Sequence, residues 1–592
     1  MRAGDRAWNG AWSDERAMRN NLVVLINPNK LHPGIPPIAL DILTTSLEQA
    51  DFNVEVVDLT FQRDRWREVL GDYFKDRSPL LVGITVRNTD TIYPQEQRVF
   101  LPEHKEIIDE VRRLTAAPLV AGGVGFSSMP FALVEYFGLD YGVKGPGELV
   151  ISGLASALRR GEPATAVPGL IINTAAGAEQ VPWAPGLPAT GLRRRAPKEV
   201  PVVNGETPYL RRSGSTFKVD NLRYYELGGL GNVLTKNGCP FRCTHCVEPD
   251  AKGDRFSRRE VGSVVAELEA LAGQGVLDVH STDSEVNLSF VHIKDILREL
   301  VERKRTRSDS PLHRLRLWLY CQPAPFDEEF ASLLAEAGCK GINFGSDHTC
   351  KSMIEGWKIT ESDRTYYSYQ NIQAANGLAL EHGMLVMHDI LLGMPGETIE
   401  TVYQCLDETL ALNATVIGYT LGIRVFPYSP LGIRFAAESG GERAIRGLQS
   451  NTATAPIVLT PLEACRSAAE YERQFMFEPS GQFRPVYFFS PELPEDEATL
   501  SSPSGRWTRT LELMRDHVPE REHTRVMLPT VPGLSKDDNN YADNPFLMLQ
   551  ARLGYKGAFW SRWRQRDQIM AEASQGDLAL SPSGRAQQPS IA

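Results

Sequence analysis

The sequence has no long hydrophobic run and no excess of basic residues, and each absence excludes a class of protein. No apolar stretch in the 592 residues reaches the about 20 residues that a membrane-spanning helix needs. Residues 1–20 lack the apolar core of a signal peptide, so we expect a disordered leader and a cytoplasmic protein with no membrane partner. With 63 Lys and Arg against 74 Asp and Glu, the net charge is −11, and no basic patch favours a nucleic-acid partner.

Cysteine is also scarce, and eight cysteines are too few for a disulfide scaffold of this length. Three of them lie close together in Cys239-Pro-Phe-Arg-Cys243-Thr-His-Cys246. Thiolates at this C-x3-C-x2-C spacing can ligate three corners of a cubane iron–sulfur cluster and leave the fourth iron without a cysteine. The alternative is a zinc site with a distant fourth ligand. Structural zinc sites usually come as two paired units, and a single unit is present here.

Short apolar segments alternate with helical segments between residues 21 and 165. Five of the apolar segments are predicted as strands, at 22–26, 54–57, 80–86, 118–121 and 141–143. Strands separated by helices favour an α/β domain with a parallel, doubly wound sheet of the Rossmann or flavodoxin type. Ligands of such sheets bind beyond the carboxyl ends of the strands.

The same alternation returns between residues 231 and 435, after a segment at 166–230 that we interpret as a linker. Six further strands are predicted, at 232–235, 276–280, 315–321, 340–345, 384–392 and 416–426. Six β-α repeats favour a partial barrel, in which the chemistry lies on the loops after the strands. Residues 436–575 are predicted as an α+β domain that closes over the substrate, and 576–592 as a disordered tail.

Further motifs accompany the cysteines, and together they resemble one family. Gly393-Met-Pro395-Gly396 follows the fifth predicted barrel strand, where glycines permit close approach of a ligand to the backbone. Gly341-Ile-Asn-Phe-Gly345 forms the fourth strand, and Phe426-Pro427-Tyr428 follows the sixth. With the glycine-rich turns of the N-terminal domain, these motifs resemble the cobalamin-dependent radical S-adenosylmethionine (SAM) methyltransferases of class B.

The resemblance implies three cofactors: a [4Fe–4S] cluster on Cys239, Cys243 and Cys246, SAM, and cobalamin in the N-terminal domain. It implies a radical SAM partial barrel for residues 231–435. The cofactor-binding residues that it implies are Asn27, Pro28, Arg87, Gly122, Gly123, Gly125, Ser127, Gly145, Gly147, Glu148, Gly345, Asp347, Gly393, Pro395, Gly396, Arg424, Pro427 and Tyr428.

The sequence departs from the family pattern at several positions. No D-x-H-x-x-G motif offers a histidine below the cobalt, and Arg87 would instead lie under the corrin, unless it binds a carboxylate or the amides of the cofactor. Asp347 ends a Gly-Ser-Asp segment where Glu-Ser-Gly is usual. Glu285 stands where Gly-Gly-Glu usually holds the amino group of SAM. It could contact SAM, ligate the open iron and so suppress radical formation, or cap the next helix.

Two further residues are candidates for substrate binding or catalysis. Tyr320 ends the third predicted barrel strand, where its hydroxyl could donate a hydrogen bond, act as a general base or simply pack. Arg424 offers a bidentate fork for a carboxylate of SAM or of the substrate.

Within the family, the chain most resembles the members that methylate tryptophan in the quinaldic acid branch of thiostrepton-type thiopeptide biosynthesis. This implies polar methyl transfer from SAM through methylcobalamin to carbon 2 of L-tryptophan, with Tyr320 or the carboxylate of SAM taking the indole proton. It also implies an external reductant and a monomeric enzyme. Three alternatives stay open: a methylase that uses a 5′-deoxyadenosyl radical, a cobalamin-binding sensor or carrier with a structural cluster, and an RNA methylthiolating enzyme, which would need a basic module.

Overall fold

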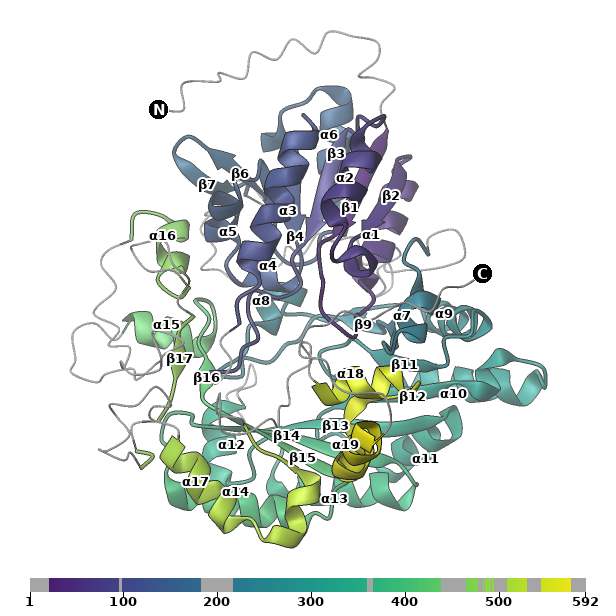
Figure 1. Ribbon diagram of the computed structural model, residues 1–592, viewed down its shortest axis with the longest axis vertical. Helices are drawn as coiled ribbons and strands as arrows, with labels where there is room; N and C mark the ends of the chain where they lie inside the picture. The colour runs from purple at the N-terminus through teal and green to yellow at the C-terminus, as the bar shows by residue number, and fades with distance from the viewer. Residues whose placement is uncertain are drawn as a thin grey trace.

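Two seven-stranded sheets organise the part of the chain that the structure describes (Figure 1). This computed structural model describes residues 21–94, 98–182, 217–358, 366–437, 465–476, 483, 485–490, 492–494, 508–529 and 545–575. The predicted leader, residues 183–216 of the predicted linker and the predicted tail lie outside these ranges. Within them, no helix combines the length and the apolar character that crossing a bilayer requires.

The N-terminal sheet has the strand order β2-β1-β3-β4-β5-β6-β7. Its first five strands are parallel and confirm the predicted ones: β1 (Leu22–Asn27), β2 (Asn53–Asp58), β3 (Leu81–Thr85), β4 (Leu119–Gly122) and β5 (Tyr141–Val143). The order 2-1-3-4-5 is that of flavodoxin-type sheets, whose ligands bind where the strand order reverses, here between β1 and β3. The helices of this domain are α1 (Ile38–Gln49), α2 (Trp66–Phe74), α3 (Leu101–Leu114), α4 (Val124–Ser128), α5 (Pro130–Phe137) and α6 (Glu148–Arg160).

Two antiparallel strands, β6 (Leu170–Thr174) and β7 (Gly177–Gln180), extend this sheet beyond the predicted domain boundary at residue 165. The interpretation of residues 170–180 as part of a linker is therefore wrong. Strands this short do not give the sustained alternation by which a half-buried strand is recognised.

The second sheet is parallel throughout, with the order β18-β15-β14-β13-β12-β11-β8. Six of its strands confirm the predicted barrel strands: β8 (Gly231–Val233), β11 (Asp278–Ser281), β12 (Arg316–Cys321), β13 (Cys339–Asp347), β14 (Leu385–Leu392) and β15 (Val416–Leu421). The principal helices around it are α9 (Val261–Gly273), α10 (Phe290–Thr306), α11 (Glu328–Ala337), α12 (Lys351–Trp357), α13 (Tyr369–Glu381) and α14 (Ile399–Ala411).

The sixth predicted strand is shorter than expected, because the chain turns at Gly422, where φ is +91°. The next strand, β16 (Ile423–Arg424), pairs instead with β17 (Tyr487–Phe488). The seventh strand of the barrel sheet, β18 (Val526–Met527), comes from the predicted C-terminal domain and pairs with β15. The described part of that domain is therefore continuous with the barrel.

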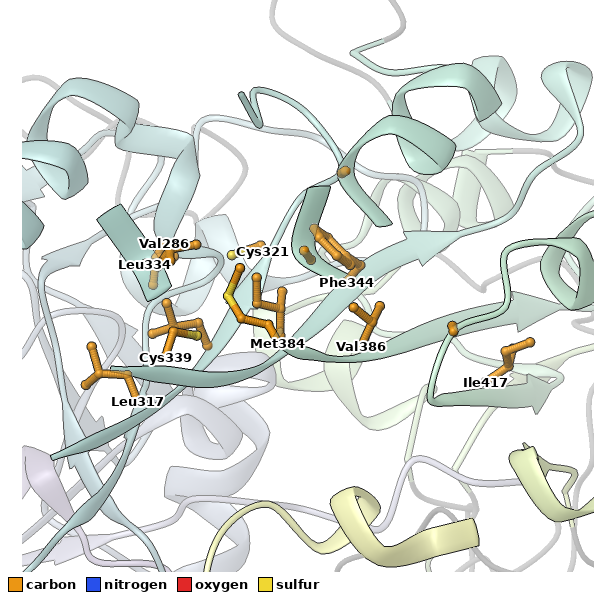
Figure 2. Packing of buried hydrophobic residues seen from close by; sticks show 14 of the residues in the cluster. Val286, Leu317, Cys321, Leu334, Cys339, Phe344, Met384, Val386 and Ile417 are labelled. Carbon is orange, nitrogen blue, oxygen red and sulfur yellow. The ribbon is translucent and has the colours of Figure 1, made fainter. Parts of the chain in front are cut away.

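Alternation along the barrel strands separates an apolar outer face from an inner face that carries polar groups. On β12, Leu317 and Cys321 enter the core beneath the surrounding helices (Figure 2), and Leu319 belongs to the same core. Trp318 and Tyr320 alternate with them and so point to the opposite, inner face. The inner face is therefore where the barrel can present chemistry.

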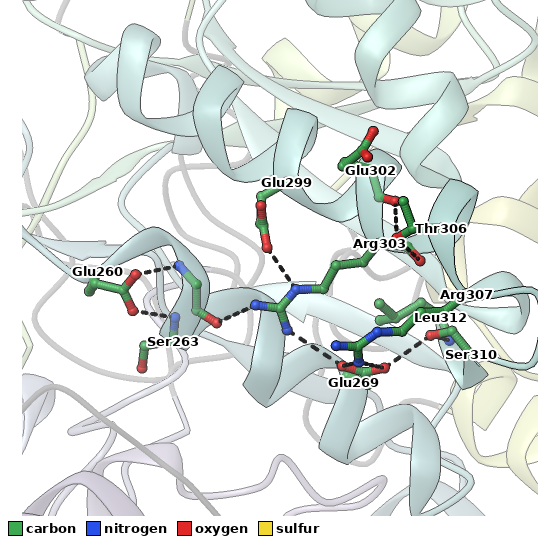
Figure 3. Close-up of polar contacts among 11 residues, drawn as sticks. Glu260, Ser263, Glu269, Glu299, Glu302, Arg303, Thr306, Arg307, Ser310 and Leu312 are labelled. Carbon is green, nitrogen blue, oxygen red and sulfur yellow. Dashed lines mark hydrogen bonds and ion pairs between the residues drawn. The ribbon is translucent and has the colours of Figure 1, made fainter.

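A polar network holds the outer helices α9 and α10 together (Figure 3). Arg303 of α10 donates hydrogen bonds to Glu299, to Glu269 of α9 and to the carbonyl of Gly262. Glu260 caps α9 by accepting from backbone N–H groups of its first turn. These contacts fix the scaffold on which the barrel strands rest.

C-terminal elements close one end of the inner face, at Trp318. Trp560 lies in η8 (Phe559–Gln565), and its ring packs edge-on against the Trp318 ring, with the two ring centroids 5.8 Å apart. Both tryptophans belong to one apolar cluster with α18 (Pro545–Arg552) and α19 (Arg566–Gln575). This packing leaves the carboxyl ends of the strands, beyond Tyr320, as the open end of the barrel.

Buried ion pairs join the N-terminal domain to the barrel. Arg424 Nε lies 3.1 Å from Asp90 Oδ2, and both side chains are almost fully buried. Lys144 Nζ lies 3.4 Å from Asp250 Oδ1. The loops that follow the strands of the N-terminal sheet are thereby held against the barrel.

Glu472, in α16 (Ala468–Arg473), forms a further contact at this seam, where it accepts hydrogen bonds from the Tyr428 hydroxyl (2.6 Å) and from the backbone N–H of Ala132 (2.7 Å). Burial raises the pKa of Glu472 from 4.5 to about 8. The folded state therefore binds the proton more tightly than the unfolded state, and the resulting stability is lost as the pH rises from 4.5 through about 8.

We expect Glu472→Gln to flatten the fall in Tm across this pH window, because the amide stays neutral throughout. Thermal unfolding of both proteins at a series of pH values measures the effect. Curves that stay parallel across the window would contradict it.

Candidate cofactor and substrate site

The cysteine motif lies in the loop after β8, at the carboxyl end of the barrel. Cys239 and Cys243 are buried, and they pack with Cys246 and Phe241 in one small cluster. The loop needs glycine at 238, where φ is +89° and a Cβ would lie 1.9 Å from the carbonyl oxygen of Arg255. The three thiols are thus brought together by local backbone geometry.

The donor set of this loop fits an iron–sulfur cluster. Burial raises the pKa of Cys239 to about 11 and that of Cys243 to about 12, so these thiols stay protonated unless a metal centre displaces their protons. The ammonium of Lys236 is buried near Cys239, and no hydrogen-bond acceptor reaches it in the described ranges. An anionic cluster would add to the negative charge that Glu248 and Glu285 already place near this ammonium.

Among the described residues, no three His, Cys, Asp or Glu side chains converge on a point that could hold a single metal ion. A cubane cluster instead takes one thiolate at each of three irons.

Glu285 lies beside the cysteine loop in a strained conformation, with φ at +123°. It accepts a hydrogen bond from Gln322 Nε2, and burial raises its pKa to about 7. A Cβ at Gly345 would lie 2.5 Å from Glu285 Oε1, so glycine at that position leaves room for the carboxylate. The Glu285 side chain makes no capping hydrogen bond to η5 (Val286–Ser289), so the capping alternative is wrong.

A second buried lysine lies on the other side of the cysteines. Lys358 Nζ lies 2.9 Å from Asp347 Oδ2, and His245 Nε2 lies 4.0 Å from the same oxygen. Burial lowers the pKa of His245, which favours its neutral form. Asp347, predicted to bind a cofactor, is therefore paired with a lysine close to Cys243.

Three polar side chains from consecutive strands meet on the inner face of the barrel. Tyr320 on β12 donates a hydrogen bond to Asp389 Oδ2 on β14 (2.7 Å), and Asn343 Nδ2 on β13 donates to the same oxygen (2.8 Å). Tyr320 and Asp389 are partly exposed, so they line accessible space. His280, in the same alternating position on β11, is held neutral because burial lowers its pKa to about 4.

The turns after β3, β4 and β5 come together at one edge of the N-terminal sheet. Ser127 Oγ donates to the carbonyl of Gly123 (2.8 Å) and accepts from the N–H of Gly145 (2.9 Å). Gly125 N–H donates to the carbonyl of Arg87 (2.9 Å). Gly123 has a φ of +112°, and a Cβ there would lie 2.6 Å from the carbonyl oxygen of Val86. These glycines let three loops pack into one backbone surface.

Arg87 stands where this surface faces the barrel. It lies close enough to His280 for its charge to contribute to the lowered pKa of that histidine. The two residues come from different domains, so the space between the domains is bounded by a cation on one side and a neutral imidazole on the other.

Some predicted cofactor ligands use their polar atoms within the protein instead. The amide nitrogen of Asn27, which has two protons to donate, lies within hydrogen-bond distance of three neighbouring side-chain oxygens. The Arg424 guanidinium is paired with Asp90, and its Nη1 lies within hydrogen-bond distance of three backbone carbonyls, so the fork predicted for a carboxylate of SAM or substrate is occupied. Tyr428 donates to Glu472. The sequence motifs identified these residues but did not indicate which protein groups they bond to.

The remaining predicted residues lie in the turns. Gly393 and Gly396 have φ values of +96° and +83°, as expected for a tight turn after β14, with Pro395 between them. The others lie at the ends of strands and the starts of helices: Pro28 after β1, Gly122 at the end of β4, Gly147 and Glu148 at the start of α6, and Pro427 before α15 (Pro430–Ala437).

Sequence reasoning missed several residues of the site. Asn343 and Asp389 occupy inner-face positions of their strands, as strand alternation indicates, but only the register of the folded sheet brings them to Tyr320. Lys236 lies in the short strand β9 (Lys236–Asn237), and Gln322 directly follows β12; no local pattern in the sequence distinguishes either from an ordinary polar residue.

Comparison with known proteins identifies relatives of both domains. The family model of the Radical SAM superfamily matches residues 233–408, and that of the B12 binding domain matches residues 29–155. Tryptophan 2-C-methyltransferase of Streptomyces laurentii is 52% identical over 598 residues, which covers 95% of this chain and 99% of the relative.

Solved structures give the same result. TsrM, a radical SAM methyltransferase from Kitasatospora setae, with tryptophan and the SAM analogue aza-SAM bound, matches at a TM-score of 0.86 and 56% identity. The match covers 94% of this chain and 99% of that chain. The structure of TsrM with cobalamin and a [4Fe–4S] cluster bound matches at the same TM-score and 55% identity, with the same coverage. The likeness therefore spans the N-terminal sheet, the barrel and the C-terminal region.

Proposed function

This chain belongs to the family of cobalamin-dependent radical SAM methyltransferases that includes tryptophan 2-C-methyltransferase, and we propose that it transfers the methyl group of SAM to carbon 2 of L-tryptophan. The observation that carries this proposal is the 52% identity to the Streptomyces laurentii enzyme over nearly the whole of both chains. The product would serve quinaldic acid formation in peptide-antibiotic biosynthesis.

The residues of each domain divide the cofactors between them. The turns at Gly123, Gly125 and Gly145 would hold cobalamin, with Arg87 below the corrin, where it cannot ligate the metal. Bound cobalamin supplies a cobalt centre that accepts a methyl group and releases it to a nucleophile. Cys239, Cys243 and Cys246 would hold the [4Fe–4S] cluster.

The Glu285 carboxylate is suited to ligate the cluster iron that has no cysteine ligand. Its carboxylate lies beside the cysteine loop and makes no capping contact, and Gly345 leaves it room. A carboxylate on that iron would keep SAM from chelating there, so SAM would act as a methyl donor rather than as a radical source.

The substrate would lie at the carboxyl end of the inner face, where Tyr320 is accessible. Carbon 2 of an indole is weakly nucleophilic, and removing the N1 proton during attack makes it more so. The Tyr320 hydroxyl would receive this proton, a role that its partly exposed place on the inner face supports, and the carboxylate of SAM is the alternative acceptor. The space between the N-terminal domain and the barrel would have to admit both SAM and tryptophan, because the cofactor would take the methyl group from one and pass it to the other.

The direct test is an anaerobic incubation of the reconstituted protein with SAM, methylcobalamin, an external reductant and L-tryptophan. We expect 2-methyltryptophan and S-adenosylhomocysteine in equal amounts, with no matching amount of 5′-deoxyadenosine, as mass spectrometry would measure. Formation of 5′-deoxyadenosine in proportion to product would indicate a radical methylase, and the absence of SAM turnover would indicate a sensor or carrier.

We also propose that the enzyme works as a cytoplasmic monomer, without a nucleic-acid or membrane partner. The net charge of −11 supports the absence of a nucleic-acid partner. Light scattering on the eluted holoenzyme measures its mass, and a dimeric mass would overturn the proposal of a monomer.

A further inference from the structure

The Tyr320 hydroxyl does not stand alone on the inner face, because its proton is already directed at a neighbour. A phenol has one proton to donate, and Tyr320 donates it to Asp389 Oδ2 across 2.7 Å. The remaining lone pairs of the phenol oxygen are therefore acceptors. A substrate N–H that approaches Tyr320 could donate a hydrogen bond to the phenol oxygen, while the phenol proton remains hydrogen-bonded to the Asp389 carboxylate.

Tyr320 is poorly suited to hold a proton without help. Surrounding protein atoms, which exclude water from much of the partly exposed Tyr320 side chain, and the adjacent Asp389 carboxylate raise the pKa of Tyr320 well above its ordinary value, so the residue is a neutral phenol rather than a phenolate. A neutral phenol is a very weak base. A proton that arrives at the Tyr320 oxygen must therefore move on, and Asp389 is the base at hydrogen-bond distance.

The position of Asp389 supports this role. On β14, Val386, Ile390 and Leu392 enter the outer core, so Asp389 alternates with them onto the inner face. Asn343 Nδ2 donates to the same carboxylate oxygen (2.8 Å) and fixes its orientation. The Asp389 side chain thus points to the substrate space, four residues before the turn at Gly393.

We propose that Asp389 is the final proton acceptor of the methyl transfer and acts through the Tyr320 hydroxyl, an inference that rests on the proposed function. As the methyl group leaves its donor without the bonding electron pair and bonds to carbon 2, the N1–H bond breaks and its electron pair enters the ring. The N1 proton forms a new O–H bond on Tyr320, while the original Tyr320 proton passes to Asp389 Oδ2. The tyrosine ends neutral, and the carboxylate becomes a carboxylic acid. Carbon 2 then carries both a hydrogen and the methyl group; it loses the hydrogen as a proton to solvent while N1 takes a proton back from solvent, which restores the aromatic indole and leaves the net proton on Asp389.

The test compares Asp389→Asn, Tyr320→Phe and the double variant in reconstituted holoenzyme. Asparagine keeps an oxygen acceptor for the tyrosine and for Asn343 but cannot take a proton. We expect each single variant to lower kcat for tryptophan by about 100-fold or more, the usual contribution of a positioned base. The double variant should be no worse than either single one, because the two groups act as one unit. Asp407→Asn, an exposed aspartate of α14, is the matched control.

Two readouts separate a proton relay from a structural role. Ring-fluorinated tryptophans have a more acidic N1–H, so the deficit of Asp389→Asn should shrink with them. The residual rate of the variant should rise with pH, because solvent must then take the proton. Equilibrium binding of tryptophan and the cluster absorption should stay as in the wild type.

The relay is overturned if the wild type forms 2-methyltryptophan while Tyr320→Phe keeps full activity and the wild-type pH profile. It is also overturned if Asp389→Asn lowers kcat by the same factor for tryptophan and for the ring-fluorinated tryptophans. Should Asp389→Asn fail to fold, Tyr320→Phe decides the question alone. If the wild type itself forms no 2-methyltryptophan, the proposed function fails instead.

Discussion

Replacing Cys243 by alanine is expected to remove both the iron–sulfur chromophore and methyl transfer. Cys243 is buried among the other two cysteines of its loop. A cubane with two cysteine ligands from this loop would lack a ligand at a second iron. We expect the iron content to fall from about four atoms per chain to below one, with 2-methyltryptophan below detection.

The matched control is Cys405→Ala. Cys405 is also fully buried, but it lies on α14, in the outer core of the barrel. We expect this variant to keep its iron, its colour and its activity, with a modest loss of stability from the small cavity. If Cys243→Ala keeps its iron, or if the wild type binds zinc instead, the assignment of the cluster to this loop is wrong.

The sequence predicted most of the fold, because the strands that build both sheets are continuous apolar runs between helices. The register of those strands was not predictable, and the register is what assembles the site. Tyr320, Asn343 and Asp389 are far apart along the chain and meet because β12, β13 and β14 are neighbours in the sheet. The sequence therefore predicted Tyr320 as a site residue but not Asn343 and Asp389, the two residues beside it in the folded sheet.

For residues that were predicted from a motif, the sequence indicated the chemistry but not the partner. Arg424 was predicted as a carboxylate ligand because an arginine fork fits a carboxylate, and it does bind one, but the carboxylate is that of Asp90. Asp90 lies in the other domain, far away in sequence, and no local pattern indicates the pairing. The cysteines were predictable for the reverse reason, since all three lie in one short loop and their spacing alone sets their geometry.

The second large effect is expected at Glu285. In Glu285→Ala, the iron without a cysteine would become accessible to the amino and carboxylate groups of SAM. We expect methyl transfer to fall sharply and 5′-deoxyadenosine to form under reducing conditions, because SAM would then be bound as in radical enzymes of this superfamily. Chromatography of the nucleoside products measures both changes, and Glu328→Gln, an exposed carboxylate at the start of α11, is the control.

Gly345→Ala tests the same carboxylate without removing it. The new Cβ would lie 2.5 Å from Glu285 Oε1, closer than unbonded atoms approach, so the carboxylate must move. The carboxylate is the far end of a flexible side chain, so it can rotate away from the new methyl group, but it then gives up its hydrogen bond from Gln322. If Glu285 occupies the iron, Gly345→Ala should shift the products in the same direction as Glu285→Ala. A variant at either position that keeps wild-type methylation and forms no 5′-deoxyadenosine would show that the carboxylate does not guard the cluster.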